Sequence, residues 1–343
     1  NTDRLLNFTK RAFENLDLKK ENKNLNKLFF DTYEIVGDSE GITKIKNIVK
    51  KIAATETRAL ILGPAGSGKE LIARTIHKSS LRKDFPFVVC NGALLDPKNF
   101  DRELFGIENP DSTITVGFFE KANNGTLLID NVSEIPLETQ TKILRVLTDQ
   151  KFHRVNGNKE ILTNIRFLSS TSKNLRKEIE LGNFREDLFQ RLSVVEIQLP
   201  DLQSRTSDIP LLIEYFMEKI SKNLGKKVIS IKPNYVKLYK HTWAGNVREL
   251  RNLVERVIIL SDGTKENIEL LVNESIESKN TNESDSILDF NSPLKTAREQ
   301  FEKEYLMHQL KKNGSNISKT AESIGMERSA LHRKLTSLGI ENK

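Results

Sequence analysis

The chain has 343 residues, with 54 Lys and Arg against 47 Asp and Glu and a formal net charge of +7. This length suits about two or three domains, and the slight basic excess fits a nucleic-acid binder without establishing one. No run of about 18 apolar residues occurs, so we expect no membrane span. The single Cys90 cannot form an internal disulfide, and the histidines lack metal-ligand spacing. Composition therefore predicts a cytoplasmic protein and disfavours a metal-dependent hydrolase of the HExxH type.

Residues 1–30 are polar with apolar side chains at helical spacing, among them Leu18, Leu25 and Leu28. This pattern predicts a helix. The helix either pairs with a partner through its narrow apolar stripe or lies on the surface of its own domain. The spacing alone does not decide between these two interpretations.

Residues 31–200 alternate short apolar runs with helical patterns. Each run is rich in β-branched or large aliphatic residues and is flanked by Gly, Asn, Asp or Pro. The runs are Ala59–Leu62, Phe87–Val89, Thr126–Ile129, Ile165–Leu168 and Val194–Ile197. Strands that alternate with helices predict a mostly parallel sheet with helices on both faces, which is an α/β domain.

The remainder of the chain divides by composition. Residues 201–264 show amphipathic helical patterns and predict a small all-α subdomain. Residues 265–292 are acidic and rich in Ser and Asn, which predicts a solvated linker. Residues 293–343 are basic and contain three further helical patterns, which predict a separate all-α domain.

A glycine-rich segment joins the first apolar run to a helical pattern. It reads Gly63-Pro64-Ala65-Gly66-Ser67-Gly68-Lys69-Glu70. Glycines let backbone N–H groups surround phosphate oxygens, the helix N-terminus adds partial positive charge, and Lys69 neutralises the β- and γ-phosphates. We therefore predict a nucleotide site rather than an ordinary turn. Glu70 stands where the general motif has the Ser or Thr that ligates Mg²⁺, so the metal must be held otherwise.

Further motifs follow in a fixed order along the chain. They are Glu103-Leu104-Phe105-Gly106, Gly125-Thr126-Leu127-Leu128-Ile129-Asp130, Phe184-Arg185-Glu186-Asp187-Leu188 with Arg191-Leu192, and Trp243-Ala244-Gly245-Asn246-Val247-Arg248-Glu249-Leu250. Together with the phosphate loop they resemble the NtrC family of bacterial enhancer-binding proteins, whose AAA+ domain remodels sigma-54 RNA polymerase. The resemblance runs from about residue 31 to the C-terminus and is closest to the NtrX branch of response regulators.

The resemblance implies a role for several side chains. Asp130 corresponds to the Walker B residue that orients water on Mg²⁺. Arg185 and Arg191 match arginine fingers that act on the ATP of a neighbouring subunit, and Arg248 matches the nucleotide sensor of the helical lid. The implied ATP contacts are the phosphate loop together with Gly125, Thr126, Asp130, Asn131 and Arg248. These roles imply a homo-oligomer, because each active site would need two chains.

Three departures from the family pattern bear on activity. Asn131 replaces the Glu that activates water, and losing a general base typically costs about 10²–10⁴ in rate. Glu134 is a candidate substitute. Ser172 replaces the sensor Asn, and the loop from Gly106 to Phe119 lacks the GAFTGA sequence that contacts sigma-54. We expect ATP binding with slow or absent hydrolysis; the alternative is an active, ATP-driven sigma-54 activator.

The last helical patterns predict a helix-turn-helix that resembles a Fis-type DNA-binding domain. Asn316 suits an N-cap, Gly325 a turn, and Leu331, Leu335 and Leu338 a buried stripe on the third helix. The expected DNA contacts on its other side are Arg328, Ser329, His332, Arg333 and Lys334. Fis-type domains dimerise through their first helix, which implies a palindromic operator or enhancer site.

The resemblance also suggests further partners. Residues 2–14 resemble the end of a receiver domain, which implies control by a sensor kinase through a domain upstream of this chain. RNA polymerase is a candidate partner, whereas direct contact with sigma-54 is not expected. The sequence does not identify the promoters, the kinase, the sign of regulation or the number of subunits.

Overall fold

The computed structural model describes residues 34–111, 113–225, 235–261, 264–284, 302, 305–307, 309–310, 313 and 316–337. The chain divides into two compact units, residues 1–269 and 270–343, each of which is described by itself. The helix expected over residues 1–30 lies outside the described residues. Within the described residues, no helix is both long and apolar enough to cross a membrane.

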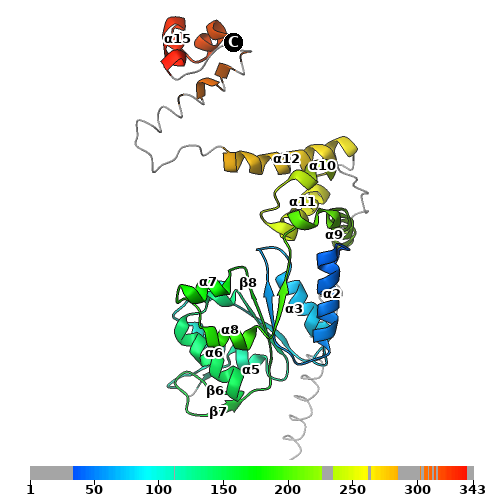
Figure 1. Ribbon diagram of the computed structural model, residues 1–343, viewed down its shortest axis with the longest axis vertical. Helices are drawn as coiled ribbons and strands as arrows, with labels where there is room; N and C mark the ends of the chain where they lie inside the picture. The colour runs from blue at the N-terminus through cyan, green and yellow to red at the C-terminus, as the bar shows by residue number, and fades with distance from the viewer. Residues whose placement is uncertain are drawn as a thin grey trace, which may run out of the picture. The chain divides into compact units, whose positions relative to one another are not determined.

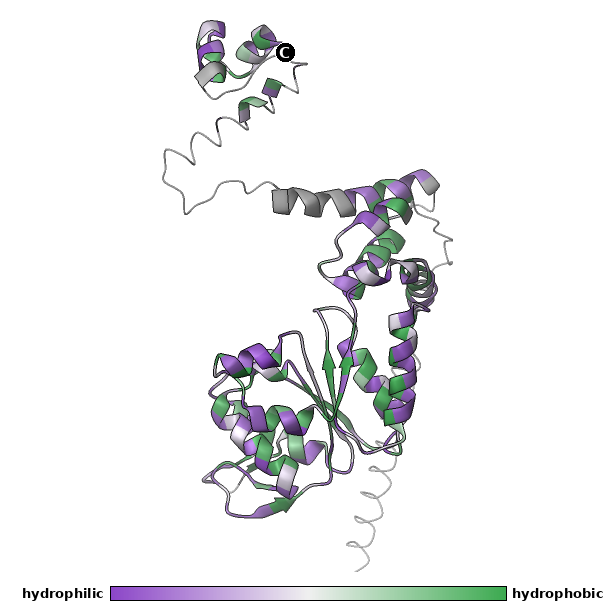
Figure 2. Ribbon diagram, in the orientation of Figure 1, coloured by the Kyte–Doolittle hydropathy of each residue, from purple (hydrophilic) through white to green (hydrophobic). Residues whose placement is uncertain are grey.

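Five parallel strands form the central sheet of the first unit (Figure 1). In spatial order they are β2 (Phe87–Asn91), β5 (Thr126–Asp130), β8 (Arg166–Thr171), β1 (Ala59–Leu62) and β9 (Val195–Gln198). Each coincides with one of the apolar runs, and in Figure 2 their arrows are largely hydrophobic. Because the strands are parallel, the carboxyl ends of β1, β5 and β8 meet at one edge. The predicted parallel sheet is confirmed.

Helices cover both faces of this sheet, and the alternation of side chains along each strand supplies both cores. On β5, Leu127 and Ile129 belong to one buried cluster, while Leu128 belongs to the other. The helices on the Leu128 side are α2 (Glu40–Ala53) and α3 (Lys69–Lys78). Those on the opposite side are α4 (Phe100–Phe105), α5 (Phe118–Lys121), α6 (Leu137–Asp149), α7 (Leu175–Glu180) and α8 (Glu186–Leu192). Each fully buried Leu or Ile stabilises the fold by about 1.5–3 kcal/mol.

Two small hairpins project from the sheet. One joins β3 (Ile107–Glu108) to β4 (Ile114–Thr115), and the other joins β6 (Lys151–His153) to β7 (Glu160–Leu162). Arg154 fastens them together, because it bonds to Glu108 at 2.9 Å and to both carboxylate oxygens of Glu120. The segment between Gly106 and Gly117 is thus a short hairpin, and Arg154 is bonded to it at Glu108.

The helical lid follows the sheet and confirms the expected all-α subdomain. The elements are the 3₁₀ helix η3 (Gln203–Asp208), α9 (Ile209–Asn223), α10 (Tyr235–Lys240) and α11 (Asn246–Leu260). Trp243 is buried between α10 and α11, where its indole N–H donates to the Leu238 carbonyl at 3.0 Å.

Helix α12 (Lys265–Ser284) occupies a segment for which the composition predicted a solvated linker. Ile268 and Val272 lie one helical turn apart, and both are buried. These two buried residues give the helix an apolar side. The acidic residues around them dominate the composition of the segment, so composition alone does not reveal the helix. The expectation of a linker beginning at residue 265 is therefore corrected for these residues.

The second unit contains α14 (Ile317–Ser323) and α15 (Arg328–Ser337). Asn316 caps α14, because its side chain accepts from the N–H groups of Ser318 and Lys319. Leu331 and Leu335 are buried in a cluster with Leu306, Leu310 and Ala321. The predicted buried stripe is thus confirmed for two of its leucines, and Leu338 lies outside the described residues.

Candidate functional site

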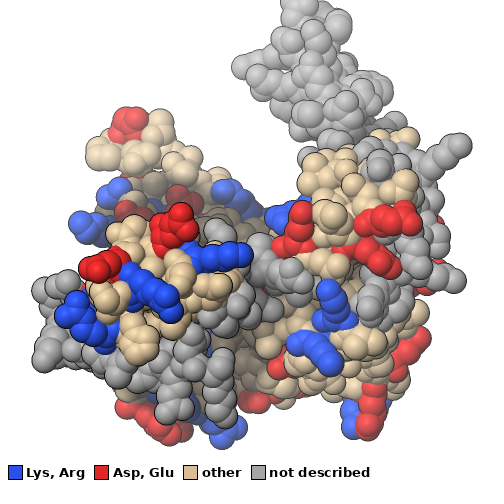
Figure 3. Space-filling view, turned by 90° about the horizontal axis from the view of Figure 1, so that it is seen from above, with Lys and Arg blue, Asp and Glu red and all other residues tan. Residues whose placement is uncertain are grey.

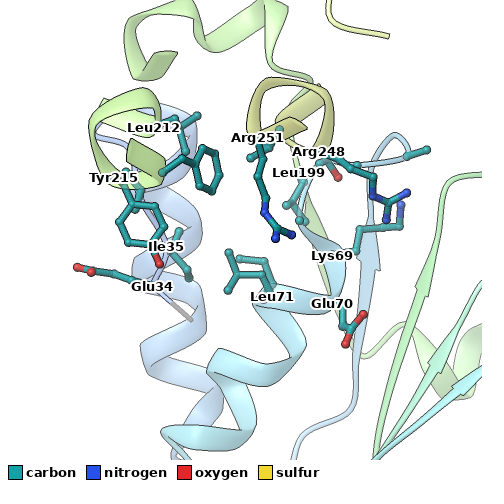
Figure 4. A pocket seen from close by; sticks show the side chains of 18 of the residues that line it. Glu34, Ile35, Lys69, Glu70, Leu71, Leu199, Leu212, Tyr215, Arg248 and Arg251 are labelled. Carbon is teal, nitrogen blue, oxygen red and sulfur yellow. The ribbon is translucent and has the colours of Figure 1, made fainter. Parts of the chain in front are cut away.

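A cavity of about 730 Å³ lies in the first unit between the glycine-rich loop, residues 34–36 and the lid helices α9 and α11 (Figure 4). Its two ends differ in chemistry. Ile35, Leu212 and Tyr215 line an apolar compartment, whereas Lys69 and Arg248 lie together at the other end. An apolar compartment joined to a cationic one suits a ligand with a planar base and an anionic tail.

The glycine-rich loop connects β1 to α3, as the motif requires. Gly66 (φ +74°) and Gly68 (φ +106°) adopt backbone conformations that other residues rarely take. Gly68 is the residue before Lys69, where α3 begins, so the free N–H groups of the first helical turn lie at the cavity. The loop therefore has the backbone geometry of a phosphate cradle.

Lys69 supplies positive charge within this cradle. Its ammonium group donates to the carbonyls of Gly63 and Pro64 at 2.9 and 3.1 Å. Burial lowers the pKa of Lys69, nearby Asp130 opposes that shift, and Arg248 adds to it. Two neighbouring cations repel each other, so an anion between them would be stabilised by both.

Asp130 lies at the carboxyl end of β5 and lines the same cavity, where the sequence placed it. Ser170 donates to its Oδ1 at 2.5 Å. Asn131, with a φ of +53°, donates from its side chain to Asn91 Oδ1 at 3.0 Å. Asn91, Asp130, Asn131 and Ser172 thus converge at the carboxyl edge of the sheet. Asn131, the residue that the resemblance aligns with a general base, has a neutral amide side chain at this edge.

Glu134 is held away from this group. Its carboxylate forms an ion pair with Lys173 at 2.9 Å, and the residue is absent from the lining of the cavity. Glu70 does line the cavity, but its carboxylate is bound by Arg74, one turn further along α3. Both Glu134 and Glu70 are therefore held in ion pairs, and neither is positioned to act as a general base in this structure.

Gly125 and Thr126 lie at the opposite end of β5 and correct the expectation that they contact nucleotide. Thr126 is fully buried and its hydroxyl bonds to His77 Nδ1 at 2.9 Å. Burial lowers the pKa of His77 to about 4, so the ring is neutral near pH 7. A strand of this length separates its ends by roughly 13 Å. The matched segment thus spans the sheet, and only its Asp130 end reaches the cavity.

Arg185 and Arg191 lie at the two ends of α8 and do not line the cavity of their own chain. Arg185 forms a bidentate pair with Asp187, at 3.0 and 2.6 Å. Arg191 is exposed. In this chain, neither guanidinium reaches the nucleotide cavity, so any catalytic contact by them requires a second chain.

Several residues that line the cavity were not identified as site residues from the sequence. The apolar compartment combines Ile35 and Val36, from before α2, with side chains of α9 such as Tyr215. Asp208 connects these segments, because its carboxylate accepts hydrogen bonds from Asp38 N and from both the N–H and hydroxyl of Ser39. These residues resemble ordinary core positions in the sequence, since only the fold brings them together.

Arg205 was also missed. It lines the cavity but is only 5% exposed, and it donates to the Ser67 carbonyl of the phosphate loop at 3.3 Å. Burial lowers the pKa of this guanidinium, while Asp208 and Asp201 oppose the shift. A buried cation beneath the phosphate loop adds to the positive charge of the anion site.

The predicted DNA-contacting side chains lie on α15 in the second unit. Arg328, Ser329, His332 and Arg333 are exposed opposite the buried leucines. Lys334 differs, because its ammonium group pairs with Glu302 at 2.9 Å. The DNA contact of Lys334 stays a prediction, and it would compete with this ion pair. Figure 3 shows basic and acidic side chains interspersed over the described part of the visible face. The DNA-binding hypothesis is based on the exposed side chains of α15.

Three family models match successive parts of the chain. Residues 35–198 match the sigma-54 interaction domain, residues 203–287 the AAA+ ATPase lid domain, and residues 297–338 the Fis family of bacterial regulatory proteins. The nitrogen assimilation regulatory protein NtrX of Azorhizobium caulinodans is 42% identical over 99% of this chain and 76% of that protein. The chain belongs to the NtrX family of response regulators.

Other NtrX proteins extend this finding. An NtrX-like response regulator of Rickettsia typhi is 40% identical over 99% of this chain and 74% of its own length. The crystal structure of Brucella abortus NtrX in complex with ATP is similar with a TM-score of 0.73 and 45% identity, over 99% of this chain and 76% of that one. A complex of the same NtrX with ADP gives a TM-score of 0.74. The Brucella abortus protein therefore binds both nucleotides.

The α15 surface of this NtrX-family chain makes a first prediction. Changing Arg328 or Arg333 to Gln should each lower the slope of log K against log salt by about one unit, because each removes one phosphate contact. Lys334→Gln is the matched comparison and should lower the slope less, because the Lys334 ammonium group is paired with Glu302. Fluorescence anisotropy with operator DNA at several salt concentrations measures this. Equal slopes for all four proteins would exclude this face of α15.

Proposed function

We propose that this chain is a DNA-binding transcriptional regulator of a two-component system, whose AAA+ module binds ATP to control oligomerisation and is degenerate for hydrolysis and sigma-54 remodelling. One observation carries the proposal. The cavity retains the phosphate loop, Lys69, Arg248 and Asp130, but presents Asn131 where the family has its general base. The residues expected to bind ATP are thus retained, whereas the residue expected to activate water for its hydrolysis is replaced.

The residues at the cavity fit ATP. The loop and its two flanking cations suit the phosphates, and the compartment beside Ile35 and Tyr215 suits the base. Mg²⁺ would rely on the nucleotide and on water held by Asp130, because Glu70 lacks the usual hydroxyl and is paired with Arg74. Among the described residues, no cluster of His, Cys, Asp and Glu could hold a metal ion by itself. Bound Mg²⁺ would neutralise phosphate charge.

Slow hydrolysis follows from the chemistry of the site. The Asn131 amide cannot accept a proton from water, and the loss of a general base costs about 10²–10⁴ in rate. The nearby Glu134 is paired with Lys173, so its use as a base would require that pair to break. Loss of sigma-54 remodelling is supported by the short hairpin between Gly106 and Gly117, which lacks the Phe-Thr of the family loop.

The retained arginines favour a role for ATP in assembly. Arg185 and Arg191 are accessible at α8, where an adjoining subunit's γ-phosphate would meet a charged, forked donor. Dimerisation through the Fis-type domain and a palindromic site remain part of the proposal, as does control by a sensor kinase. Subunit number is left to experiment.

A nucleotide-dependent change in mass tests this role. Adding a non-hydrolysable ATP analogue should increase the sedimentation coefficient of the wild-type protein. Arg191→Ala should block the increase while nucleotide still binds, since truncating one partner of a charge pair that assembly would bury costs about 2 kcal/mol or more. Arg145→Ala changes an exposed arginine of α6 and serves as the control. The same mass increase in the Arg191 variant would refute the assignment.

A second candidate function is ATP-driven activation of sigma-54 polymerase. The match of residues 35–198 to the sigma-54 interaction domain favours it, because Lys69, Asp130 and both finger arginines are retained. Open-complex formation with sigma-54 polymerase in the presence of ATP would establish this function and refute the degenerate one.

A further inference from the structure

The start of lid helix α11 is bonded directly to the crest of the phosphate loop. The Asn246 side chain donates from Nδ2 to the Ala65 carbonyl at 3.0 Å, and the Arg248 N–H donates to the Gly66 carbonyl at 3.2 Å. Figure 4 shows Arg248 reaching from α11 toward Lys69. Two successive peptide groups of the loop thus hold the lid.

Asn246 also bonds to the segment that connects β9 to the 3₁₀ helix η3. Its Oδ1 accepts from the N–H of Leu202 at 2.8 Å, and Leu202 is completely buried. Asn246 itself is 3% exposed and adopts a φ of +51°, a conformation that Asn tolerates better than most residues. The buried amide of Asn246, the first residue of α11, therefore bonds both to the phosphate loop and to the segment that contains Leu202.

The phosphate loop at Gly66 packs closely against the lid at Gly245. A Cβ placed on Gly66 would lie 2.1 Å from the carbonyl oxygen of Gly245. The loop crest therefore cannot shift toward α11 without moving the lid. A shift in the other direction would lengthen the bonds to Asn246 and Arg248.

Phosphate binding would act on the same two peptide groups from their other side. In a trans peptide the C=O and the following N–H point in opposite directions within one rigid plane. The Ala65 carbonyl faces Asn246, so the Gly66 N–H of that plane points away from the lid. If phosphate oxygens recruit the loop N–H groups, the planes rotate and the carbonyls that hold the lid rotate with them.

From this geometry we propose that Asn246 is a positioning residue that couples phosphate-loop occupancy to the lid. The proposal rests on nucleotide binding in the cavity, and it deepens that function by assigning the transmission step. Asn246 need not touch the nucleotide. Its amide converts a rotation of the loop into a displacement of α11, the helix that carries the sensor Arg248.

The chain contains its own reporter of this step. Trp243 is the only tryptophan in the sequence and is 4% exposed. The Asn246 N–H donates to the Trp243 carbonyl at 2.8 Å, so the reporter is bonded to the proposed positioning residue. Displacement of α11 should therefore change the emission of Trp243.

The decisive variant is Asn246→Asp. Asp keeps the shape and the acceptor for Leu202 N–H, and it suits the positive end of a helix. It replaces the Nδ2 donor by an oxygen that repels the Ala65 carbonyl, so the bond to the loop is lost together with a long 3.5 Å bond from Nδ2 to the neighbouring Ala244 carbonyl. Asn246→Gly removes both bonds but accepts the positive φ. The matched control is Asn156→Asp, an exposed Asn with a φ of +62° in the β6–β7 hairpin.

The experiment measures binding and coupling in the same samples. Anisotropy of a fluorescent ADP analogue gives affinity, and Trp243 emission with unlabelled ADP or ATP gives the lid response. We expect wild type and Asn156→Asp to bind and to respond. Asn246→Asp should bind with an affinity within about fivefold of wild type, a loss no larger than one hydrogen bond, but lose most of the Trp243 response.

Two outcomes would overturn the proposal. A full Trp243 response in both Asn246 variants would show that the loop and the lid are coupled without the amide. Parallel loss of affinity and response, with unchanged thermal unfolding, would make Asn246 part of the binding site. If wild type itself fails to bind either nucleotide, the proposed function fails first, and that result is read from anisotropy alone.

Discussion

Replacing Asn131 by Glu is expected to raise the rate of ATP hydrolysis by about 10²–10⁴, the usual contribution of a general base. Asn131 stands at the carboxyl edge of the sheet beside Asp130 and Ser172, so a carboxylate there would face the same cavity. The side chain sits on a backbone with a φ of +53°, and Glu tolerates this less well at a cost on the order of 1 kcal/mol. Phosphate release under saturating Mg-ATP measures the gain.

Two further variants make this result specific. Asn131→Gln extends the side chain without supplying a base and should stay at the wild-type rate. Glu134→Gln in the Asn131→Glu background should keep the gain, because Glu134 is paired with Lys173 outside the cavity lining. If Glu134→Gln instead abolished hydrolysis in the wild type, the proton acceptor would be Glu134 and the site would not be degenerate.

Replacing Lys69 by Met is expected to cost about 2–5 kcal/mol of nucleotide affinity, since it truncates one partner of a desolvated charge pair. Met keeps the apolar stem of the side chain, and the carbonyls of Gly63 and Pro64 can recover water when Lys69 no longer binds them. Calorimetric titration with ATP gives the loss directly. The effect should be larger for ATP than for ADP, because Lys69 acts on the terminal phosphates.

Lys78→Met is the matched control for this experiment, because Lys78 is the last residue of the same helix and is exposed. It should bind ATP like the wild type. Equal affinity of Lys69→Met and wild type would place the nucleotide elsewhere. The thermal unfolding of both variants, measured without nucleotide, shows whether α3 itself is altered.

Much of the fold can be predicted from the sequence, and the reason is physical. Parallel strands buried on both faces are mostly apolar, so β1 and the centre of β5 appear as short apolar runs such as Ala59–Leu62. The phosphate loop can also be recognised in the sequence, because the local backbone geometry requires its glycines. Both signals are short-range, and each is complete within a few consecutive residues.

The base end of the cavity could not be predicted in the same way. Ile35 and Tyr215 meet there only after the sheet and the lid are assembled, and singly each looks like a core residue. Asn246 illustrates the same limit, because the motif that contains it was recognised through Arg248 while the bonds of its amide depend on the fold. Gly125 was misassigned because a linear motif does not show which end of a strand faces the ligand.

The most direct test of the account measures bound ATP and released phosphate in one sample of the wild-type protein with Mg²⁺, with and without operator DNA. We expect one ATP bound per chain, with phosphate release no faster than in Lys69→Met under either condition. Sustained Mg-dependent turnover above that background would contradict it and would establish the chain as an active ATPase.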